Sequence, residues 1–315
     1  MLSDNLKKVA VIGTGVIGAG WIVRCLAHNK KVIAYDKNFK LKKQLIVEIK
    51  RTWPYVKKLF NKKKLNLKNF EYVTSIEKAL RTADFIQECA TENYRIKTKL
   101  MNIIGKYAKP NVIISSSSSG LLPTRIYSKC KNPARTMIGH PFNPVYMCPG
   151  VEIVPGKKTK KKFLNKANKF YKSISMNPIM VKKELPGYLA DRLQEALWRE
   201  ALHIVNEGYA STKDLDRAIE DGPGLRWSLM GIFLTYHLAG GKAGMKHMLE
   251  QFGPALKLPW TKLKAPTLSK KLSSRIIEGT RQQAKGKSVA MISNVRDEYL
   301  LSLQKLRKKF EKKIR

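Results

Sequence analysis

The feature that most constrains this chain is a glycine-rich turn near its N-terminus. The β-branched run 9–12 leads directly into Gly13-x-Gly15-x-x-Gly18, which opens a helical pattern. In such a turn the first glycine allows the tight bend, the second lets the backbone approach a pyrophosphate, and the third lets the helix pack on the strand. The helix N-terminus presents N–H groups and a positive dipole end to phosphate. We therefore predict a unit that binds a dinucleotide through the residues Gly13, Thr14, Gly15, Val16, Ile17 and Gly18.

An acidic residue follows the next predicted strand at the position that a dinucleotide requires. The run 32–35 ends in Asp36. A carboxylate here accepts hydrogen bonds from the adenine ribose hydroxyls and repels a 2′-phosphate, so the pattern favours NAD over NADP. The neighbouring Lys37 weakens the case against NADP. The alternative interpretation is a simple glycine turn followed by a helix-capping aspartate.

The first half of the chain alternates short apolar runs with helical patterns. We predict strands at 9–12, 32–35, 85–88, 112–115, 136–139, 151–154 and 179–181, and helices at 16–28, 39–63, 94–108 and 160–173. Alternation of this kind is typical of a parallel sheet with helices on both faces. The predicted architecture is an α/β, Rossmann-type doubly wound sheet.

The pattern changes at residues 185–187, which read Leu-Pro-Gly. Beyond this point no strand is predicted, and helical patterns occupy 188–207, 212–220, 226–239, 243–252 and 267–285, with a basic helix over 301–315. A chain of 315 residues is long enough for about two domains. We therefore expect a cofactor domain over 1–185, followed by an all-helical domain over 186–315 that completes the substrate site.

The chain is strongly basic, with 62 Lys and Arg against 23 Asp and Glu, a net charge of +39. Much of this charge lies in 40–70, 157–172 and 301–315. In 40–70 apolar residues recur every three or four positions, so the lysines fill the other face of a helix. We interpret these stretches as solvated lysine faces and expect no specific nucleic-acid partner, because no nucleic-acid motif accompanies the charge.

Cysteine usage and hydropathy bear on the compartment. None of the four cysteines lies in a C-x-x-C pair, and no signal peptide precedes them, which favours reduced thiols and a cytoplasmic protein. The longest uncharged apolar stretch, 9–23, is shorter than the about 20 residues that a membrane span needs. We expect neither a membrane span nor a metal site.

A histidine and a glutamate on neighbouring predicted strands are candidates for acid–base chemistry. His140 follows one strand and Glu152 lies in the next. Oxidation of an alcohol by NAD requires a base for the hydroxyl proton, and histidine has a suitable pKa. A carboxylate can fix its tautomer. Residues 115–119, all serine, end another strand at the edge where ligands of open α/β sheets bind. A core histidine and a polar serine loop are the alternatives.

These features together resemble the 3-hydroxyacyl-CoA dehydrogenase family over nearly the whole chain. The residues that carry the resemblance are the glycine pattern, Asp36, Ser119, His140-x-x-Asn143-Pro and Glu152. The resemblance implies that His140 is the general base and that Glu152 orients it. It also implies that Ser119 and Asn143 lie beside the nicotinamide and the substrate oxygen.

The same resemblance implies further contacts and a partner. Within 91–97 it assigns NAD contacts to Glu92 and Lys97. The helical domain of this family usually mediates dimerisation, so the resemblance implies a homodimer. One position departs from the acyl-CoA members, which carry a substrate-binding Asn where this chain has Asp191. An ionised Asp accepts hydrogen bonds but cannot donate them, so that role cannot be transferred.

Within the family, the chain resembles the branch that acts on L-carnitine more than the branch that acts on L-gulonate. Six segments carry this likeness: 118–123, 140–146, 191–202, 224–227, 239–247 and 251–263. The carboxylate of such a substrate needs a cation, for which Arg226 is the candidate. Its quaternary ammonium prefers aromatic faces, and the candidates are Phe142, Tyr146, Trp227 and Phe252. Asp191 is a further candidate substrate residue, with a local salt bridge to Arg192 or Arg199 as the alternative.

Two other interpretations remain open. The first is a dehydrogenase of the same family that acts on L-gulonate or on a 3-hydroxyacyl-CoA. The second belongs to another class: a basic structural or binding protein on a retained dehydrogenase fold, motivated by the charge of +39. The leading hypothesis is an NAD-dependent dehydrogenase that oxidises L-carnitine to 3-dehydrocarnitine, and NADH formation with L-carnitine would separate it from the first of these interpretations. Salt-resistant nucleic-acid binding without NAD binding would support the second.

Overall fold

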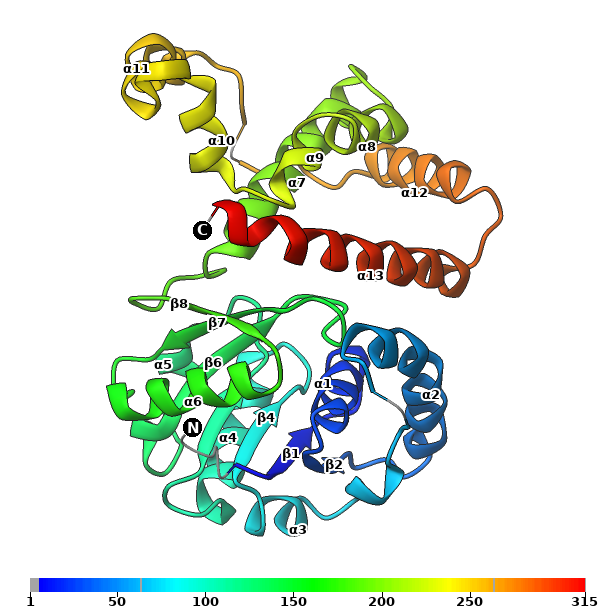
Figure 1. Cartoon of the computed structure of the whole chain (residues 1–315), viewed down its shortest axis with the longest axis vertical. Helices are drawn as coiled ribbons and strands as arrows, with labels where there is room; N and C mark the ends of the chain where they lie inside the picture. Colours follow the sequence, from blue (N-terminus) through cyan, green and yellow to red (C-terminus); the bar gives the residue numbers. More distant parts are fainter. Residues whose placement is uncertain (1–5, 63, 263, 315) are drawn as a thin grey trace. The chain divides into compact units, whose positions relative to one another are not determined.

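The computed structural model describes residues 6–62, 64–262 and 264–314. The chain divides into two compact units, Met1–Arg192 and Leu193–Arg315. The first unit is built on one sheet and the second on helices (Figure 1). The Rossmann-type sheet and the helical second part that the sequence predicts are therefore confirmed.

Eight strands form the sheet of the first unit, in the order β3-β2-β1-β4-β5-β6-β7-β8. The chain leaves β1 on one side for β2 and β3, and then returns to the other side for β4, so the strand order reverses between β1 and β4. Ligands of open α/β sheets bind at such a reversal, beyond the carboxyl ends of the strands. The strands are β1 (Lys8–Ile12), β2 (Lys31–Tyr35), β3 (Phe70–Val73), β4 (Phe85–Glu88), β5 (Ile113–Ser116), β6 (Thr136–Pro141), β7 (Gly150–Pro155) and β8 (Asn177–Met180).

The sheet is not parallel throughout. Strands β1 to β6 all run parallel to one another, whereas β7 pairs antiparallel with β6. The expectation of a parallel sheet was wrong at this pair. The connection 142–149 is short and contains no helix, and a parallel neighbour needs a crossover of a dozen residues or more. Strand β3 is a further addition to the predicted set.

The helices of the first unit bury apolar stripes and expose lysines. In α6 the residues Phe163, Ala167, Phe170 and Tyr171 are buried. All eight lysines of 157–172 are exposed. Helix α2 likewise buries Leu45, Ile49, Thr52 and Val56. The six helices are α1 (Val16–Ala27), α2 (Leu41–Leu59), α3 (Ile76–Arg81), α4 (Tyr94–Tyr107), α5 (Pro123–Ile126) and α6 (Lys161–Ser173), with short 3₁₀ turns at Leu67–Asn69 and Pro133–Arg135.

The second unit is helical in all its described elements. Where the sequence predicts one helix over 226–239, the structure has two, because the chain breaks at Ser228–Gly231 and Gly231 becomes the N-cap of the second. The basic C-terminal helix begins earlier than predicted. The helices are α7 (Ala190–Glu207), which starts in the first unit, α8 (Thr212–Glu220), α9 (Pro223–Trp227), α10 (Ile232–Ala239), α11 (Met245–Phe252), α12 (Lys270–Ala284) and α13 (Val289–Ile314), with 3₁₀ turns at Gly241–Ala243 and Gly253–Lys257.

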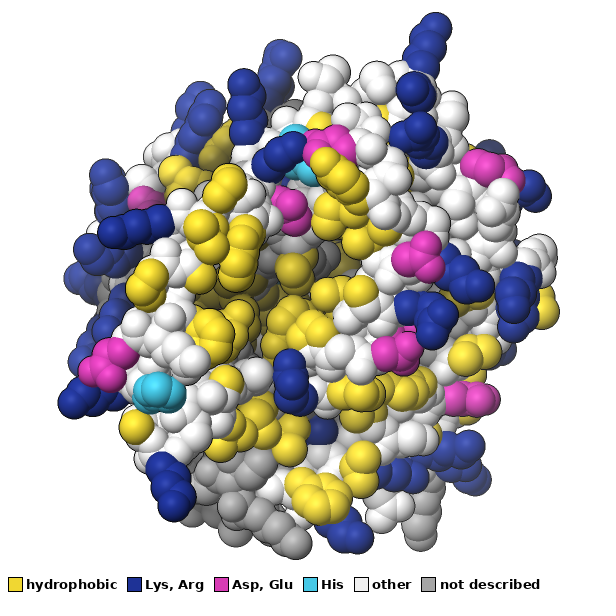
Figure 2. Space-filling view, turned by 90° about the horizontal axis from the view of Figure 1, so that it is seen from above, with side chains coloured by type: hydrophobic (Ala, Val, Ile, Leu, Met, Phe, Trp, Pro, Cys, Tyr) yellow, Lys and Arg dark blue, Asp and Glu magenta, His cyan; other side chains and the backbone are white. Residues whose placement is uncertain are grey.

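Many apolar side chains of the second unit are exposed. Figure 2 shows hydrophobic side chains over much of the middle of the face in view, with Lys and Arg around them and a few among them. Leu193, Leu197 and Trp198 on α7 are each about half exposed. Among the described residues no helix has the length and hydropathy of a membrane span. No group of three or more His, Cys, Asp and Glu side chains there could hold a metal ion.

Candidate active site

The glycine turn at the carboxyl end of β1 has the conformation that its residue types predict. Gly13 has φ +102°, and a Cβ there would lie 2.8 Å from the carbonyl oxygen of Cys89. A Cβ on Gly18 would overlap the carbonyl of Gly13, whereas a Cβ on Gly15 would meet no protein atom within 4 Å. Gly13 and Gly18 are therefore required by the fold. Gly15 borders open space at the N-terminus of α1, which fits the pyrophosphate of a dinucleotide.

The acidic residue after β2 reaches this turn. The carboxylate of Asp36 accepts hydrogen bonds from the backbone N–H and the hydroxyl of Thr14, at 3.3 and 3.1 Å, both through Oδ2. Its Oδ1 accepts from the backbone N–H of Asn38. Asp36 is partly exposed, and a carboxylate offers about four acceptor positions. It therefore retains acceptor capacity for ribose hydroxyls, and the residues present fit NAD.

A buried ion pair lies beneath the turn. The ammonium of Lys97 is 1% exposed and donates to both carboxylate oxygens of Glu88, at 2.8 and 3.0 Å, and to the carbonyl of Ala90. Glu88 also accepts from the backbone N–H of Ala90 and from the hydroxyl of Ser116. Because these bonds hold the segment after β4 that faces Gly13, Lys97 supports the cofactor turn from below.

Glu92 connects the same segment to the serine run. Its Oε1 accepts from the hydroxyl of Ser118 at 2.6 Å and from the backbone N–H groups of Ser119 and Gly120. Its Oε2 lies 3.5 Å from the ammonium of Lys97. Ser119 is exposed at the carboxyl end of β5. Glu92 and Lys97 therefore belong to one network that orients the Ser119 loop.

His140 and Glu152 face each other across the antiparallel pair β6–β7. Nδ1 of His140 lies 2.8 Å from Oε2 of Glu152. The other carboxylate oxygen, Oε1, accepts from the backbone N–H groups of Leu189 and Ala190 at the start of α7. The sequence predicted that His140 would follow its strand, but it lies within β6. The reversed direction of β7 is what places the two side chains opposite each other.

The environment of Glu152 keeps it ionised. Burial by itself would raise the pKa of this carboxyl. Hydrogen bonds from His140 and from the backbone N–H groups of Ala190 and Leu189 favour the charged form more strongly, so the pKa is lowered from its ordinary value. A neutral imidazole that donates Nδ1–H to this carboxylate presents the lone pair of Nε2 as a proton acceptor.

A second carboxylate lies on the other side of the imidazole. Oδ2 of Asp191 is 3.7 Å from Nε2 of His140, and its side chain is 35% exposed. The edge-on rings of Phe142 and Tyr188 flank His140, with centroids at 5.5 and 5.6 Å. Tyr188 was not predicted from the sequence as a site residue. A signal was available, because it follows the Pro-Gly pair at the predicted boundary, and both Gly187 and Tyr188 have positive φ.

The other site residues predicted from the sequence lie on several different elements. Asn143 is exposed after β6. Tyr146 is not presented as an aromatic face: it is 5% exposed, and its hydroxyl accepts from Arg51 of α2 at 3.3 Å. Arg226, Trp227 and Phe252 belong to the second unit, on α9 and α11. There Arg226 is exposed and Phe252 is 46% exposed.

The carboxyl ends of β1, β4, β5 and β6 share one edge of the sheet, because these strands are mutually parallel. That edge carries the glycine turn, the carboxylate of Asp36 beside it and a buried histidine–carboxylate pair. This combination defines an NAD-dependent dehydrogenase. The comparisons with known proteins agree: the model "3-hydroxyacyl-CoA dehydrogenase, NAD binding domain" matches residues 8–185, and the C-terminal domain model of that family matches 187–279.

Curated relatives cover almost the entire chain. The L-carnitine dehydrogenase of Oceanobacillus iheyensis is 49% identical over 95% of this chain and 97% of its own. That of Pseudomonas aeruginosa is 47% identical over 95% and 93%. The chain belongs to the 3-hydroxyacyl-CoA dehydrogenase family, and it is an NAD-dependent dehydrogenase of 3-hydroxy substrates.

Solved structures share the fold at low identity. A 5-formyl-3-hydroxy-2-methylpyridine 4-carboxylic acid 5-dehydrogenase has a TM-score of 0.81 at 21% identity, over 96% of this chain and 99% of the other. (S)-3-hydroxybutyryl-CoA dehydrogenase from Ralstonia eutropha has a TM-score of 0.63 at 21% identity, over 90% and 95%. These likenesses concern the fold alone.

Proposed function

We propose that this protein oxidises L-carnitine to 3-dehydrocarnitine, with His140 as the general base. The observation that carries the proposal is the position of the imidazole between two carboxylates, Glu152 at Nδ1 and Asp191 at Nε2. The names of the curated relatives support the choice of substrate.

In the proposed reaction Nε2 of His140 accepts the proton of the C3 hydroxyl. When bound, NAD supplies the hydride acceptor. The imidazolium that forms on His140 donates Nδ1–H to Glu152, whose negative charge stabilises it. Because Glu152 also accepts from the start of α7, its carboxylate cannot rotate away from the imidazole without losing those bonds.

The substrate is a zwitterion, and the proposal assigns one group to each end. We assign the carboxylate of the substrate to Arg226, whose guanidinium can bind it in a bidentate manner. Asp191 attracts the trimethylammonium, which is attached one carbon from the reacting centre and has no N–H to donate. Phe142 contributes an aromatic edge, and Trp227 and Phe252 remain candidates for the cation. Ser119 and Asn143 orient the C3 oxygen.

The direct test is NADH formation with L-carnitine, measured by absorbance. We expect His140→Gln to lower kcat by about 10²–10⁴-fold, the range for loss of a positioned base, while the affinity for NAD stays unchanged. His28→Gln is the matched control, since His28 lies just beyond the end of α1 and bonds to Ser175 and to the carbonyl of Arg24.

Two results would contradict the proposal. If the wild type is inactive with L-carnitine but oxidises L-gulonate or 3-hydroxybutyryl-CoA, the substrate is wrong and the family remains. If His140→Gln retains the wild-type kcat, the base is another group.

A further inference from the structure

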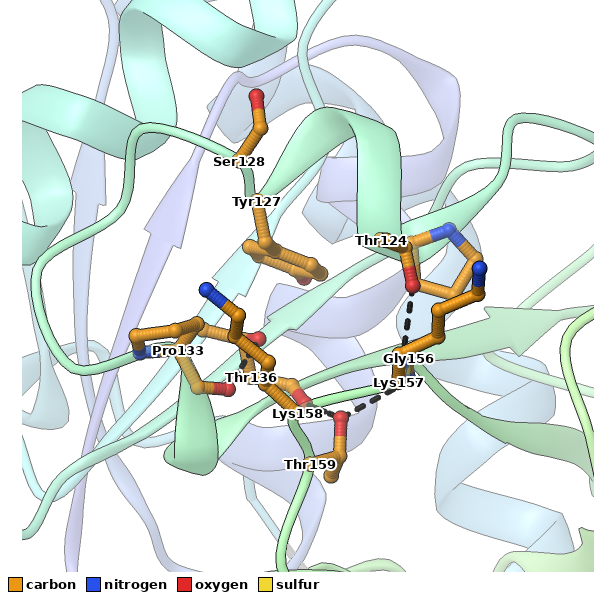
Figure 3. Close-up of a pocket in the computed structure, with 10 residues that line it drawn as sticks. Thr124, Tyr127, Ser128, Pro133, Thr136, Gly156, Lys157, Lys158 and Thr159 are labelled. Carbon is orange, nitrogen blue, oxygen red and sulfur yellow. Dashed lines mark hydrogen bonds between the residues drawn. The ribbon is translucent and has the colours of Figure 1, made fainter.

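A second concave site lies in the first unit, at the other end of the strands that carry His140 and Glu152. It has a volume of about 160 Å³ and lies between α5, the start of β6 and the turn that follows β7. Figure 3 shows Lys157 and Lys158 extending from this turn in diverging directions, Lys157 past Thr124 and Lys158 below Tyr127. We propose that this cavity binds a small phosphorylated anion.

The charge of the cavity is positive and unopposed along its lining. Lys157 and Lys158 line it, and neither ammonium has a hydrogen-bond or ion-pair partner among the residues that the structure describes. Among the described residues no acidic side chain lines it; the neighbouring Glu184 instead accepts the backbone N–H of Thr124. The eight lysines of 157–172, without any acid, strengthen the local field, and concave sites concentrate counter-ions in such a field.

Neutral donors complete the site. The hydroxyl of Thr124 accepts from the backbone N–H of Lys157 at 2.8 Å, so its own O–H remains available to a ligand. Ser128 also lines the cavity, but its hydroxyl points away from the other labelled residues in Figure 3. Thr159 is committed to the fold, because it accepts from the N–H of Gly156 and donates to the carbonyl of Thr136. Lysine ammonium and hydroxyl groups are a donor set that suits phosphate.

The size and the apolar walls limit the ligand. The rings of Pro123, Tyr127 and Pro133 line the cavity beside the polar groups. The cavity, at about 160 Å³, is smaller than typical cofactor pockets. The ligand is therefore inorganic phosphate or a phosphate ester with a short carbon chain.

The cavity lies where a bound ligand would contact the ends of two strands. Thr136 begins β6, and Gly156 directly follows β7, so the cavity borders the ends of both strands. An anion that bridges Lys157, Lys158 and Thr124 would tie this end of the β6–β7 pair to α5. Binding should therefore stabilise the first unit against unfolding.

The test measures thermal unfolding with inorganic phosphate, against sodium chloride at the same ionic strength. We expect phosphate at about ten times its Kd to raise the Tm of the wild type by roughly 2–4 °C. The double variant Lys157→Gln/Lys158→Gln should lose this rise. The control Lys166→Gln/Lys169→Gln removes the same charge from exposed positions of α6 outside the cavity and should keep it.

Three proteins and three anions decide the outcome. Equal rises in all three proteins, or no rise in the wild type with either inorganic phosphate or glycerol 3-phosphate, would overturn the site, since the effect would then be general charge screening or absent. Glycerol 3-phosphate and acetate form the other arms. A rise in the Tm of the wild type with glycerol 3-phosphate alone identifies a phosphate ester as the ligand. A rise with both glycerol 3-phosphate and inorganic phosphate shows that the free anion suffices. An equal rise with acetate would overturn the phosphate assignment. These readouts do not involve catalysis, so they are independent of the proposed oxidation of carnitine.

Discussion

At the level of single residues, the charge of Asp191 is the most informative departure from the acyl-CoA members of the family. An Asn at this position can donate a hydrogen bond to a substrate, and an ionised Asp cannot. Its carboxylate lies 3.7 Å from Nε2 of His140, where the reacting hydroxyl would bind. A fixed negative charge here favours a substrate with a positive charge close to the reacting carbon. The residue therefore bears on substrate choice rather than on proton transfer itself.

The variant Asp191→Asn should separate the effect of the charge of this side chain from the effect of its shape. The probe is 3-hydroxy-5,5-dimethylhexanoate, the carbon isostere of carnitine, in which an uncharged tert-butyl group replaces the trimethylammonium. We expect the variant to lower kcat/KM for L-carnitine by about tenfold and to leave kcat/KM for the isostere nearly unchanged, because an attraction of about 1.4 kcal/mol, reasonable for a partly exposed pair, is lost only for the cation. Steady-state NADH formation measures both.

Arg226→Gln is the matched comparison. Both compounds have the same carboxylate, so removal of the proposed carboxylate-binding cation should lower kcat/KM for both by a similar factor. An Asp191→Asn variant that loses activity equally on both compounds would contradict a charge-specific role.

At the level of elements, the strand–turn–helix unit shows how well local sequence specifies local structure. Gly18 is required by a contact within the unit itself and Gly13 by its positive φ, so the glycine spacing predicted the turn. By contrast, β3 and the direction of β7 were not predicted, and 226–239 was predicted as one helix. Strand direction depends on the path of a connection and on its neighbours, and neither is encoded in the periodicity of the strand itself.

Two alanine substitutions in this unit should have opposite effects. Gly15→Ala meets no protein atom within 4 Å, so its unfolding temperature should stay near that of the wild type. Its methyl group enters the space assigned to the pyrophosphate, and we expect the Kd for NAD to rise at least tenfold. Gly18→Ala should instead lower the free energy of unfolding by about 1–3 kcal/mol, because its Cβ overlaps the carbonyl of Gly13. Calorimetric titration and thermal melts measure the two effects, and wild-type affinity in Gly15→Ala would place the cofactor elsewhere.

At the level of the whole molecule, the two units differ in how completely they bury apolar side chains. In the first unit, buried apolar residues of the strands and of the helices form a continuous core. The second leaves Leu197 at 48% and Phe233 at 83% exposed, among many others. Large apolar patches on a protein surface mark contact sites. We propose that a second copy of the chain covers part of this surface, as the family resemblance implies.

The oligomeric state tests this proposal. We expect light scattering after gel filtration to give twice the mass of 35.9 kDa, and Leu197→Glu to shift the protein toward the monomer. Val47→Glu is the control, because Val47 is 61% exposed on α2 of the first unit. A monomeric wild type at micromolar concentration would refute the dimer. If both variants dissociate equally, the cause is a general loss of stability rather than an interface on α7.

The sequence by itself determined the cofactor turn, the acid after the second strand, the Rossmann-type class of the sheet and the pair His140 and Glu152. These features depend on residue types at short spacing, where sterics and hydrogen bonding act within one element or between two neighbours. Only the tertiary structure decided that β7 reverses and so places Glu152 opposite His140. It also decided that Tyr188 and Asp191 flank the imidazole, that Tyr146 turns into the core, and that Lys157 and Lys158 line a cavity with α5. Each of these depends on contacts between residues far apart in the chain, which form only when the sheet assembles.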